Sequence, residues 1–141
     1  MGLKRLRTAS RRKHGMAMVE MVFVLPVLVL TVFAIAQFGL MFSRWLTLSN
    51  AVREGAREGA AYRVPPCNPG TVQTDVQTKV VSYARAGGVG ISNGDVNVTN
   101  ACDASGTKQL KVDATFNFKV NIPFFSLSSI PLKYESTMRI E

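Results

Sequence analysis

Histidine and cysteine, the residues that most often bind metals or act in nucleophilic catalysis, are scarce in this sequence. The one histidine, His14, lies in the N-terminal stretch, and the two cysteines are Cys67 and Cys102. These cysteines do not form a C-x-x-C pair, and two thiols alone do not complete a zinc site. A histidine without a partner in the body of the chain does not support acid–base catalysis there. The sequence therefore predicts no metal, no cofactor and no enzymatic activity.

Acidic residues are absent from the N-terminal leader, which spans residues 1–15. Six of the 17 Lys and Arg residues lie in this leader, so 11 of them face 9 acidic residues in the rest of the chain. The net charge of +8 therefore belongs mainly to the leader, and the body is close to neutral. A nucleic-acid-binding domain is not expected from this distribution.

Charged residues are also nearly absent from the following stretch, residues 16–42. It contains no Lys, Arg, His or Asp, and its one acidic residue is Glu20. As a helix this stretch would be about 40 Å long at ~1.5 Å per residue, which exceeds the ~30 Å hydrocarbon core of a bilayer. A buried core helix is the alternative, but a small soluble domain could not cover a helix that is apolar on all sides. The stretch therefore predicts a transmembrane helix.

The basic residues predict which way this helix crosses the membrane. The leader is strongly basic, whereas Arg44 alone follows the apolar stretch directly. The positive-inside bias then keeps the N-terminus in the cytoplasm and places the C-terminal domain in the periplasm or outside the cell, with one pass through the bacterial inner membrane. A cleaved secretory signal is the competing interpretation, because Ala34-Ile35-Ala36 resembles its cleavage site.

The membrane helix is expected to continue beyond residue 42, as an extension over residues 43–64 that ends before Pro65-Pro66. This gives one helix of roughly 45 residues. Within the extension, Arg53-Glu54-Gly55-Ala56 is repeated as Arg57-Glu58-Gly59-Ala60. The spacing of four places Gly55 over Gly59 and Ala56 over Ala60 on the helix surface. This small-residue face predicts close packing against a partner or the chain's own domain, and the alternative is a solvated juxtamembrane helix.

Residues 65–141 are expected to form a small α+β domain. Val72, Val76, Val80, Tyr83 and Ala84 recur at helical spacing, which predicts an amphipathic helix over residues 71–86 that Gly87-Gly88 ends. Beyond Gly88, apolar residues recur at every second position, and this alternation predicts three strands. Alternating apolar residues define them: Val96 and Val98; Leu110 to Val120; Leu132 to Ile140. A three-stranded antiparallel meander on the helices follows, with a long turn over residues 123–131.

Cys67 and Cys102 are expected to form a disulfide if this domain lies outside the cytoplasm. The bond would close about 35 residues and stabilise the fold by roughly 3 to 4 kcal/mol in the chain-entropy model. The alternative is a pair of free buried thiols.

One local pattern joins the leader to the apolar stretch. Gly15 ends the basic run Arg11-Arg12-Lys13-His14, and Glu20 follows it inside the stretch. This resembles the processing site of type IV pilin-like proteins, where a membrane aspartyl peptidase cuts after the glycine. By this resemblance the cut falls between Gly15 and Met16, and Glu20 becomes the fifth residue of the mature chain.

The resemblance extends along the chain and is closest to the TadE-like pseudopilins of the tight-adherence (Tad) pilus system. The segments that carry it are Glu20 to Pro26, Gln37-Phe38-Gly39, Asn50 to Arg57 and Ser136 to Glu141. It implies a minor pilin or pseudopilin for adhesion or secretion. The implied partners are a prepilin peptidase, the inner-membrane platform, other pseudopilins and the major pilin.

Glu20 also invites a physical explanation, because a charge within the membrane is costly and usually marks a function or a paired group. A cut after Gly15 would create a positive α-amine at Met16, and the two charges could neutralise one another within one chain or between neighbours. A membrane-tethered binding module with a plain anchor is the second hypothesis. It would tolerate the loss of Glu20.

Overall fold

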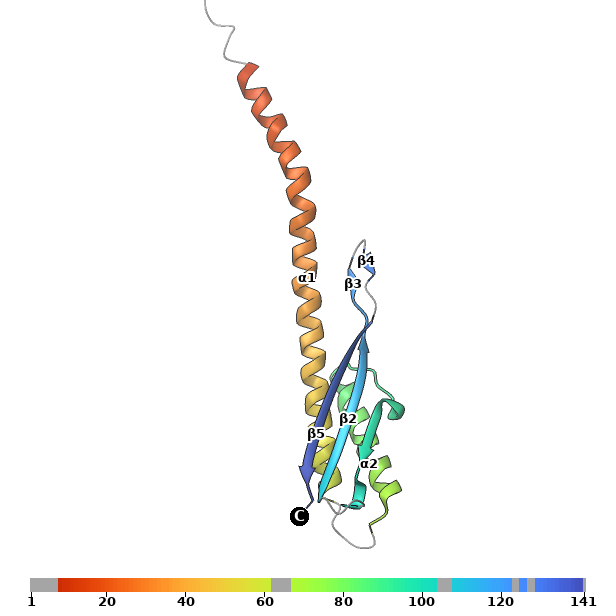
Figure 1. Cartoon of the computed structure of the whole chain (residues 1–141). Coiled ribbons are helices and arrows are strands. Elements are labelled where there is room, and N and C mark those ends of the chain that lie inside the picture. The colour runs from red at the N-terminus through yellow and green to blue at the C-terminus, as the bar shows by residue number, and fades with distance from the viewer. Residues whose placement is uncertain (1–7, 62–66, 104–107, 123–124, 127–128, 141) are drawn as a thin grey trace, which may run out of the picture.

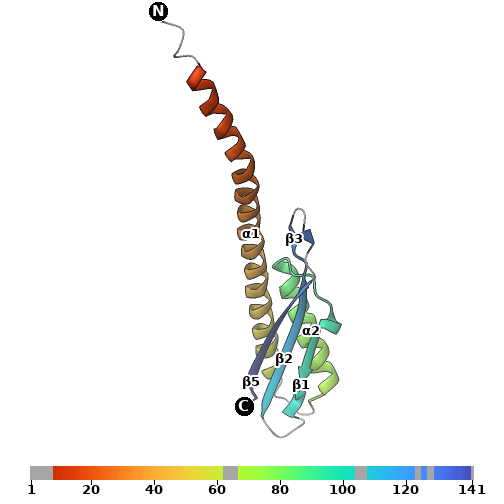
Figure 2. The ribbon, with the colours of Figure 1, turned by 45° about the horizontal axis from the view of Figure 1, so that its top comes forward.

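The computed structural model describes residues 8–61, 67–103, 108–122, 125–126 and 129–140. It has one long N-terminal helix, a second helix and a three-stranded antiparallel sheet, so the α+β prediction is confirmed (Figure 1). The C-terminal part of the long helix packs on the other elements. Its N-terminal part projects away from them, as both views show (Figures 1 and 2).

Helix α1 runs from Thr8 to Ala60 over 53 residues and is longer than the sequence predicted. The helix already begins inside the basic leader, where the sequence analysis placed no helical residue. It ends at Ala60, and the expected end before Pro65-Pro66 lies outside the described residues. Pro26 is accommodated inside the helix, although its ring removes one backbone hydrogen bond.

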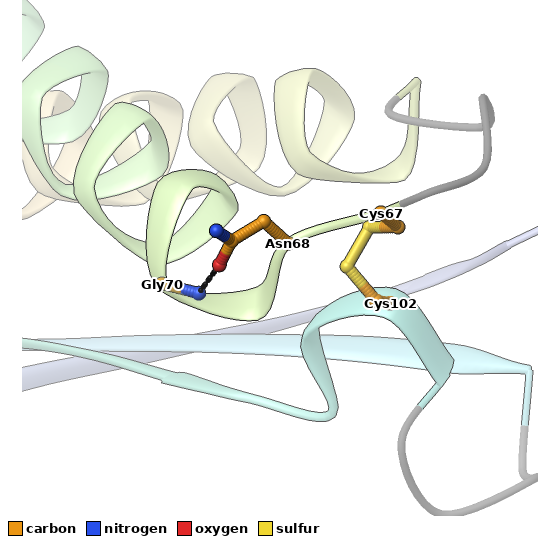
Figure 3. Close-up of a disulfide and its surroundings, with 4 residues drawn as sticks. All are labelled: Cys67, Asn68, Gly70 and Cys102. Carbon is orange, nitrogen blue, oxygen red and sulfur yellow. Dashed lines mark hydrogen bonds between the residues drawn. A yellow bond between two sulfur atoms is a disulfide. The ribbon is translucent and has the colours of Figure 1, made fainter.

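Helix α2 runs from Pro69 to Ala86, close to the predicted range. Asn68 caps its N-terminus, since the side-chain oxygen accepts a hydrogen bond from the Gly70 N–H at 3.0 Å, and Pro69 suits the first turn (Figure 3). The buried residues of α2 are Val72, Val76, Val80, Val81 and Ala84. Tyr83 was wrongly placed on the buried face: it is 45% exposed, and Val81 is buried instead.

The main sheet contains β1 (Val96–Thr99), β2 (Gln109–Phe118) and β5 (Ile130–Arg139) in that order, all antiparallel. Strand β2 ends at Phe118 and does not include Val120, to which the apolar alternation extended. Two short 3₁₀ turns, Asn93–Asp95 and Ala101–Asp103, flank β1. Pro131 lies inside β5, where it is tolerated because β5 is an edge strand with one unpaired side.

A second, two-stranded sheet was missed by the sequence analysis. Strands β3 (Asn121–Ile122) and β4 (Phe125–Ser126) pair as a hairpin. Part of the stretch that the sequence analysis assigned to a turn, residues 123–131, therefore belongs to strands. Strands of two residues are too short for an alternating pattern to identify them.

The core lies between the two helices and one face of the main sheet. Its members from α1 are Leu48, Ala51, Val52 and Ala56, which pack with the valines of α2 and with Leu110, Val112 and Ala114 of β2. The opposite face of the sheet is polar. There Lys111 Nζ lies 2.9 Å from Glu135 Oε2, and this carboxylate raises the pKa of Lys111. The helices therefore cover one face of the sheet only, as the alternating strand patterns predicted.

Candidate functional site

The N-terminal part of α1 exposes apolar side chains on every side. Met16 is 77% exposed, Phe23 is 73% exposed and Leu28 is 59% exposed. This helix is long and apolar enough to cross a membrane, and none of its most apolar window is buried in the structure. The helix is therefore suited to be a single-pass membrane anchor.

The predicted processing residues and Glu20 all lie on α1. Gly15 and Met16 are consecutive helical residues, and the side chain of Glu20 is exposed. Met16 and Glu20 are four residues apart, so they lie one turn apart on the same side of the helix. An amine created at Met16 would therefore lie near the carboxylate of its own chain and would also be accessible to a neighbouring chain.

A cluster of aromatic and arginine side chains marks the point where α1 reaches the domain. The Phe42 and Trp45 rings are stacked, with centroids 6.2 Å apart, and Trp45 meets the edge of Tyr134 from β5. Arg44 Cζ lies 5.2 Å from the centroid of the Phe118 ring. Trp and Tyr are enriched at membrane–water interfaces, so this junction has the composition expected at the membrane surface. This cluster was not predicted from the sequence, although Trp45, just after the apolar stretch, was a signal.

The small-residue face packs against the chain's own domain. A Cβ on Gly55 would overlap Val80 of α2, and one on Gly59 would overlap Leu110 of β2. Ala56 is fully buried, whereas Ala60 is only half-buried at the end of the helix. The glycines thus allow α1 to approach α2 and β2 closely, which larger side chains would prevent. Of the two partners considered for this face, the structure places the chain's own domain there.

The charged side of the same repeat remains accessible. Glu54 pairs with Arg57 at 3.2 Å, and Glu58 lies 3.8 Å from Lys79 of α2. These pairs are partly exposed to solvent, so each contributes little to stability.

A disulfide joins Cys67 and Cys102 in the structure, with their Cα atoms 5.8 Å apart. Figure 3 shows Cys67 just before α2 and Cys102 in the 3₁₀ turn that follows β1. The bond thus ties the start of α2 to the end of β1. The alternative of two free thiols does not describe this structure, which has no free cysteine.

Among the residues that the structure describes, no three His, Cys, Asp or Glu side chains come together in a way that could hold a metal ion.

The comparison with known protein families finds a match on helix α1. Residues 15–57 match the TadE-like protein family. The matched range begins at the predicted processing glycine, and it includes Glu20 and Gly55. It ends three residues before the end of α1, so the TadE-like segment is a single helix with an exposed apolar part and a packed part.

The rest of the chain lies outside the TadE-like match, including α2, the sheets and the Ser136 to Glu141 segment. No curated protein and no solved structure matches the chain. The TadE-like match therefore concerns helix α1 alone.

Proposed function

We propose that this chain is a minor pilin or pseudopilin that takes part in the biogenesis of a Tad-type pilus, used for adhesion or secretion. The observation that carries the proposal is the TadE-like match over residues 15–57, which covers Gly15, Met16 and Glu20 on one helix. The role is structural: the helix is inserted and packed among other helices, and no catalytic step is assigned to any residue.

The placement of charge supports one orientation for this role. The basic leader stays in the cytoplasm, the TadE-like helix crosses the inner membrane, and the domain lies in the periplasm or outside the cell. The disulfide between Cys67 and Cys102 is consistent with an oxidising compartment for the domain.

The exposed helix also supports the proposed partners. A prepilin peptidase would cut between Gly15 and Met16, and the platform, other pseudopilins and the major pilin would contact the apolar surface of α1. Because the C-terminal part of α1 is covered by its own domain, the N-terminal part, in which most side chains are exposed, is the part open to such helices. Helix–helix contacts with other subunits are therefore assigned to residues 16–42.

Deletion of the gene, with complementation, tests the proposal in cells that express the Tad system. Pili should disappear or decrease on deletion and return with the wild-type gene. Immunolabelling of sheared filaments then shows whether the chain enters the filament or acts only during assembly. Normal piliation in the deleted strain would overturn the proposal and favour a membrane-tethered binding module.

A further inference from the structure

Strand β1 contains a short sequence pattern that the pilus role does not use. Asn97-Val98-Thr99 has the form Asn-x-Ser/Thr with a residue other than proline in the middle, which is the acceptor pattern for N-linked glycosylation. Of the seven asparagines in the sequence, Asn97 is the one with Ser or Thr two residues later. So short a pattern also arises by chance, so the surroundings of Asn97 decide whether it can serve as an acceptor.

The side chains of Asn97 and Thr99 lie on the uncovered face of the main sheet. Val96 belongs to the hydrophobic core and Val98 packs against it, so the alternate residues of β1 point away from the helices. Asn97 and Thr99 are both exposed. The amide and the hydroxyl that the pattern requires are therefore on the same open surface.

The position of β1 leaves room for a large substituent on Asn97. The strand is four residues long and forms one edge of the sheet, as Figure 2 shows, so it pairs with β2 on one side only. The Asn97 amide Nδ2 donates an exposed hydrogen bond of 3.3 Å to Asp113 Oδ1, which water can replace at little cost. A sugar on Asn97 would extend into solvent without displacing a core residue. The fold therefore accommodates a glycan whether it is added before or after folding.

An acidic residue precedes the pattern. Asp95 lies two residues before Asn97 and is exposed, although its Oδ2 accepts hydrogen bonds from the Ser92 N–H and hydroxyl. A carboxylate at this point adds a charge to the segment, and charge complementarity helps an enzyme to select one segment among several. The exposed polar residues from Asp95 to Thr99 thus form one recognition segment.

The proposed orientation brings this segment close to a membrane-borne sugar donor. The domain then lies outside the cytoplasm, and α1 tethers it to the bilayer. A donor attached to a lipid carrier lies in the same bilayer, so tethering raises the effective concentration of each near the other. The inference that follows rests on this exported position of the domain and is independent of the role in pilus biogenesis.

We infer that Asn97 is an N-glycosylation site of the exported domain, with an oligosaccharide on a polyprenyl diphosphate as the donor and a membrane-bound oligosaccharyltransferase as the enzyme. Asn97 Nδ2 attacks the anomeric carbon of the first sugar. A C–N bond forms there while the C–O bond to the diphosphate breaks, and the polyprenyl diphosphate leaves with that electron pair. A base of the transferase takes one proton from Nδ2, the other N–H remains, and nothing is oxidised or reduced. The glycan extends from the polar face of the sheet and leaves the apolar surface of α1 free for other helices.

Mass spectrometry of the full chain, purified from cells that express the Tad system, tests the inference. The peptide that contains Asn97 should carry an oligosaccharide, which electron-transfer fragmentation assigns to the asparagine. Asn97→Gln keeps an amide but should lose the glycan. Thr99→Ser keeps the hydroxyl and should retain the glycan, whereas Thr99→Val keeps the shape without the hydroxyl and should lose it. Asn117→Gln, at an exposed asparagine outside the pattern, is the matched control and should retain the glycan.

An unmodified Asn97 in the wild-type chain would overturn the inference. A glycan that persists in Thr99→Val would also overturn it, because transfer would then not depend on the pattern. Equal circular dichroism of the two Thr99 variants shows that a lost glycan does not reflect lost folding. The cysteines in the same digest distinguish this failure from a failure of the orientation: with Asn97 unmodified, a linked Cys67 and Cys102 leave the exported domain in place, whereas free thiols contradict the orientation as well.

Discussion

Arg53 of α1 and Tyr134 of β5 are joined across the domain by a hydrogen bond, in which Arg53 Nε donates to the Tyr134 hydroxyl at 2.8 Å. The guanidinium also lies near the ring, with Cζ 5.5 Å from the centroid, and Trp45, two turns earlier in α1, contacts the same ring. Tyr134 thus connects the edge strand of the sheet to the part of α1 that follows the apolar stretch.

Tyr134→Phe should therefore destabilise the domain while leaving the ring contacts in place. Loss of the hydrogen bond is expected to cost about 0.5–1.5 kcal/mol, nearer the lower value because the bond is exposed. The measurement is denaturant unfolding of the full chain in detergent micelles. Tyr83→Phe, at an exposed tyrosine of α2, is the control and should have little effect. Equal stability of the Tyr134→Phe and wild-type chains would show that the bond does not contribute.

Gly55→Ala and Gly59→Ala should each destabilise the packing of α1 on its domain. Overpacking costs about 1–3 kcal/mol, and at Gly59 the added Cβ would also come within 2.8 Å of Val76 Cγ2. Alanine favours the helix by up to about 1 kcal/mol over glycine, so the net loss is smaller than the overpacking cost alone. Gly39→Ala is the matched control in the same helix, because no atom lies within 4 Å of its added Cβ. Thermal unfolding should show lower stability for the first two variants only.

Cys67 and Cys102 should be recovered as one intramolecular disulfide in the exported protein. Peptide mapping without reduction should find the two peptides linked. The double variant Cys67→Ser with Cys102→Ser should lose roughly 3 to 4 kcal/mol of stability, by the entropy of the closed loop in the unfolded chain. Quantitative alkylation of both thiols in native, unreduced protein would contradict this prediction.

Cleavage is predicted between Gly15 and Met16 in cells that express the Tad system. Intact-mass analysis should find a chain that starts at Met16, and a Gly15→Leu variant should retain the leader because the peptidase requires a small residue there. A chain that starts at Gln37 would instead support a secretory signal, and the membrane anchor would then be lost.

Glu20→Gln is expected to reduce pilus production while cleavage and protein abundance remain near normal. The variant keeps the size of the side chain but removes the charge, so the helix should insert at least as well: an acid at mid-membrane costs about 2.5–3.5 kcal/mol, and less toward the interface. Glu20→Ala should behave in the same way, which distinguishes loss of charge from loss of shape. Wild-type piliation in both variants would rule out charge pairing with a Met16 amine and favour a plain anchor.

Much of the architecture could be predicted because it depends on patterns between near neighbours in the chain. The uninterrupted apolar stretch after Gly15 predicts a membrane helix through its length, and the change of apolar period after Gly88 predicts the step from helices to strands. The alternation in β5 likewise predicts which of its residues face the helices. These features require only the geometry of a single helix or strand.

The sequence by itself determined the long apolar helix, the order of the two helices and the three strands of the main sheet, and the small-residue face of α1. Tertiary structure alone decided that Gly55 and Gly59 pack on Val80 and Leu110, because a smooth helix face fits many surfaces and does not specify one. It also decided the Arg53–Tyr134 bond and the position of Phe118 next to Arg44. Such contacts depend on how whole elements align with one another, and no local pattern in either element contains that alignment.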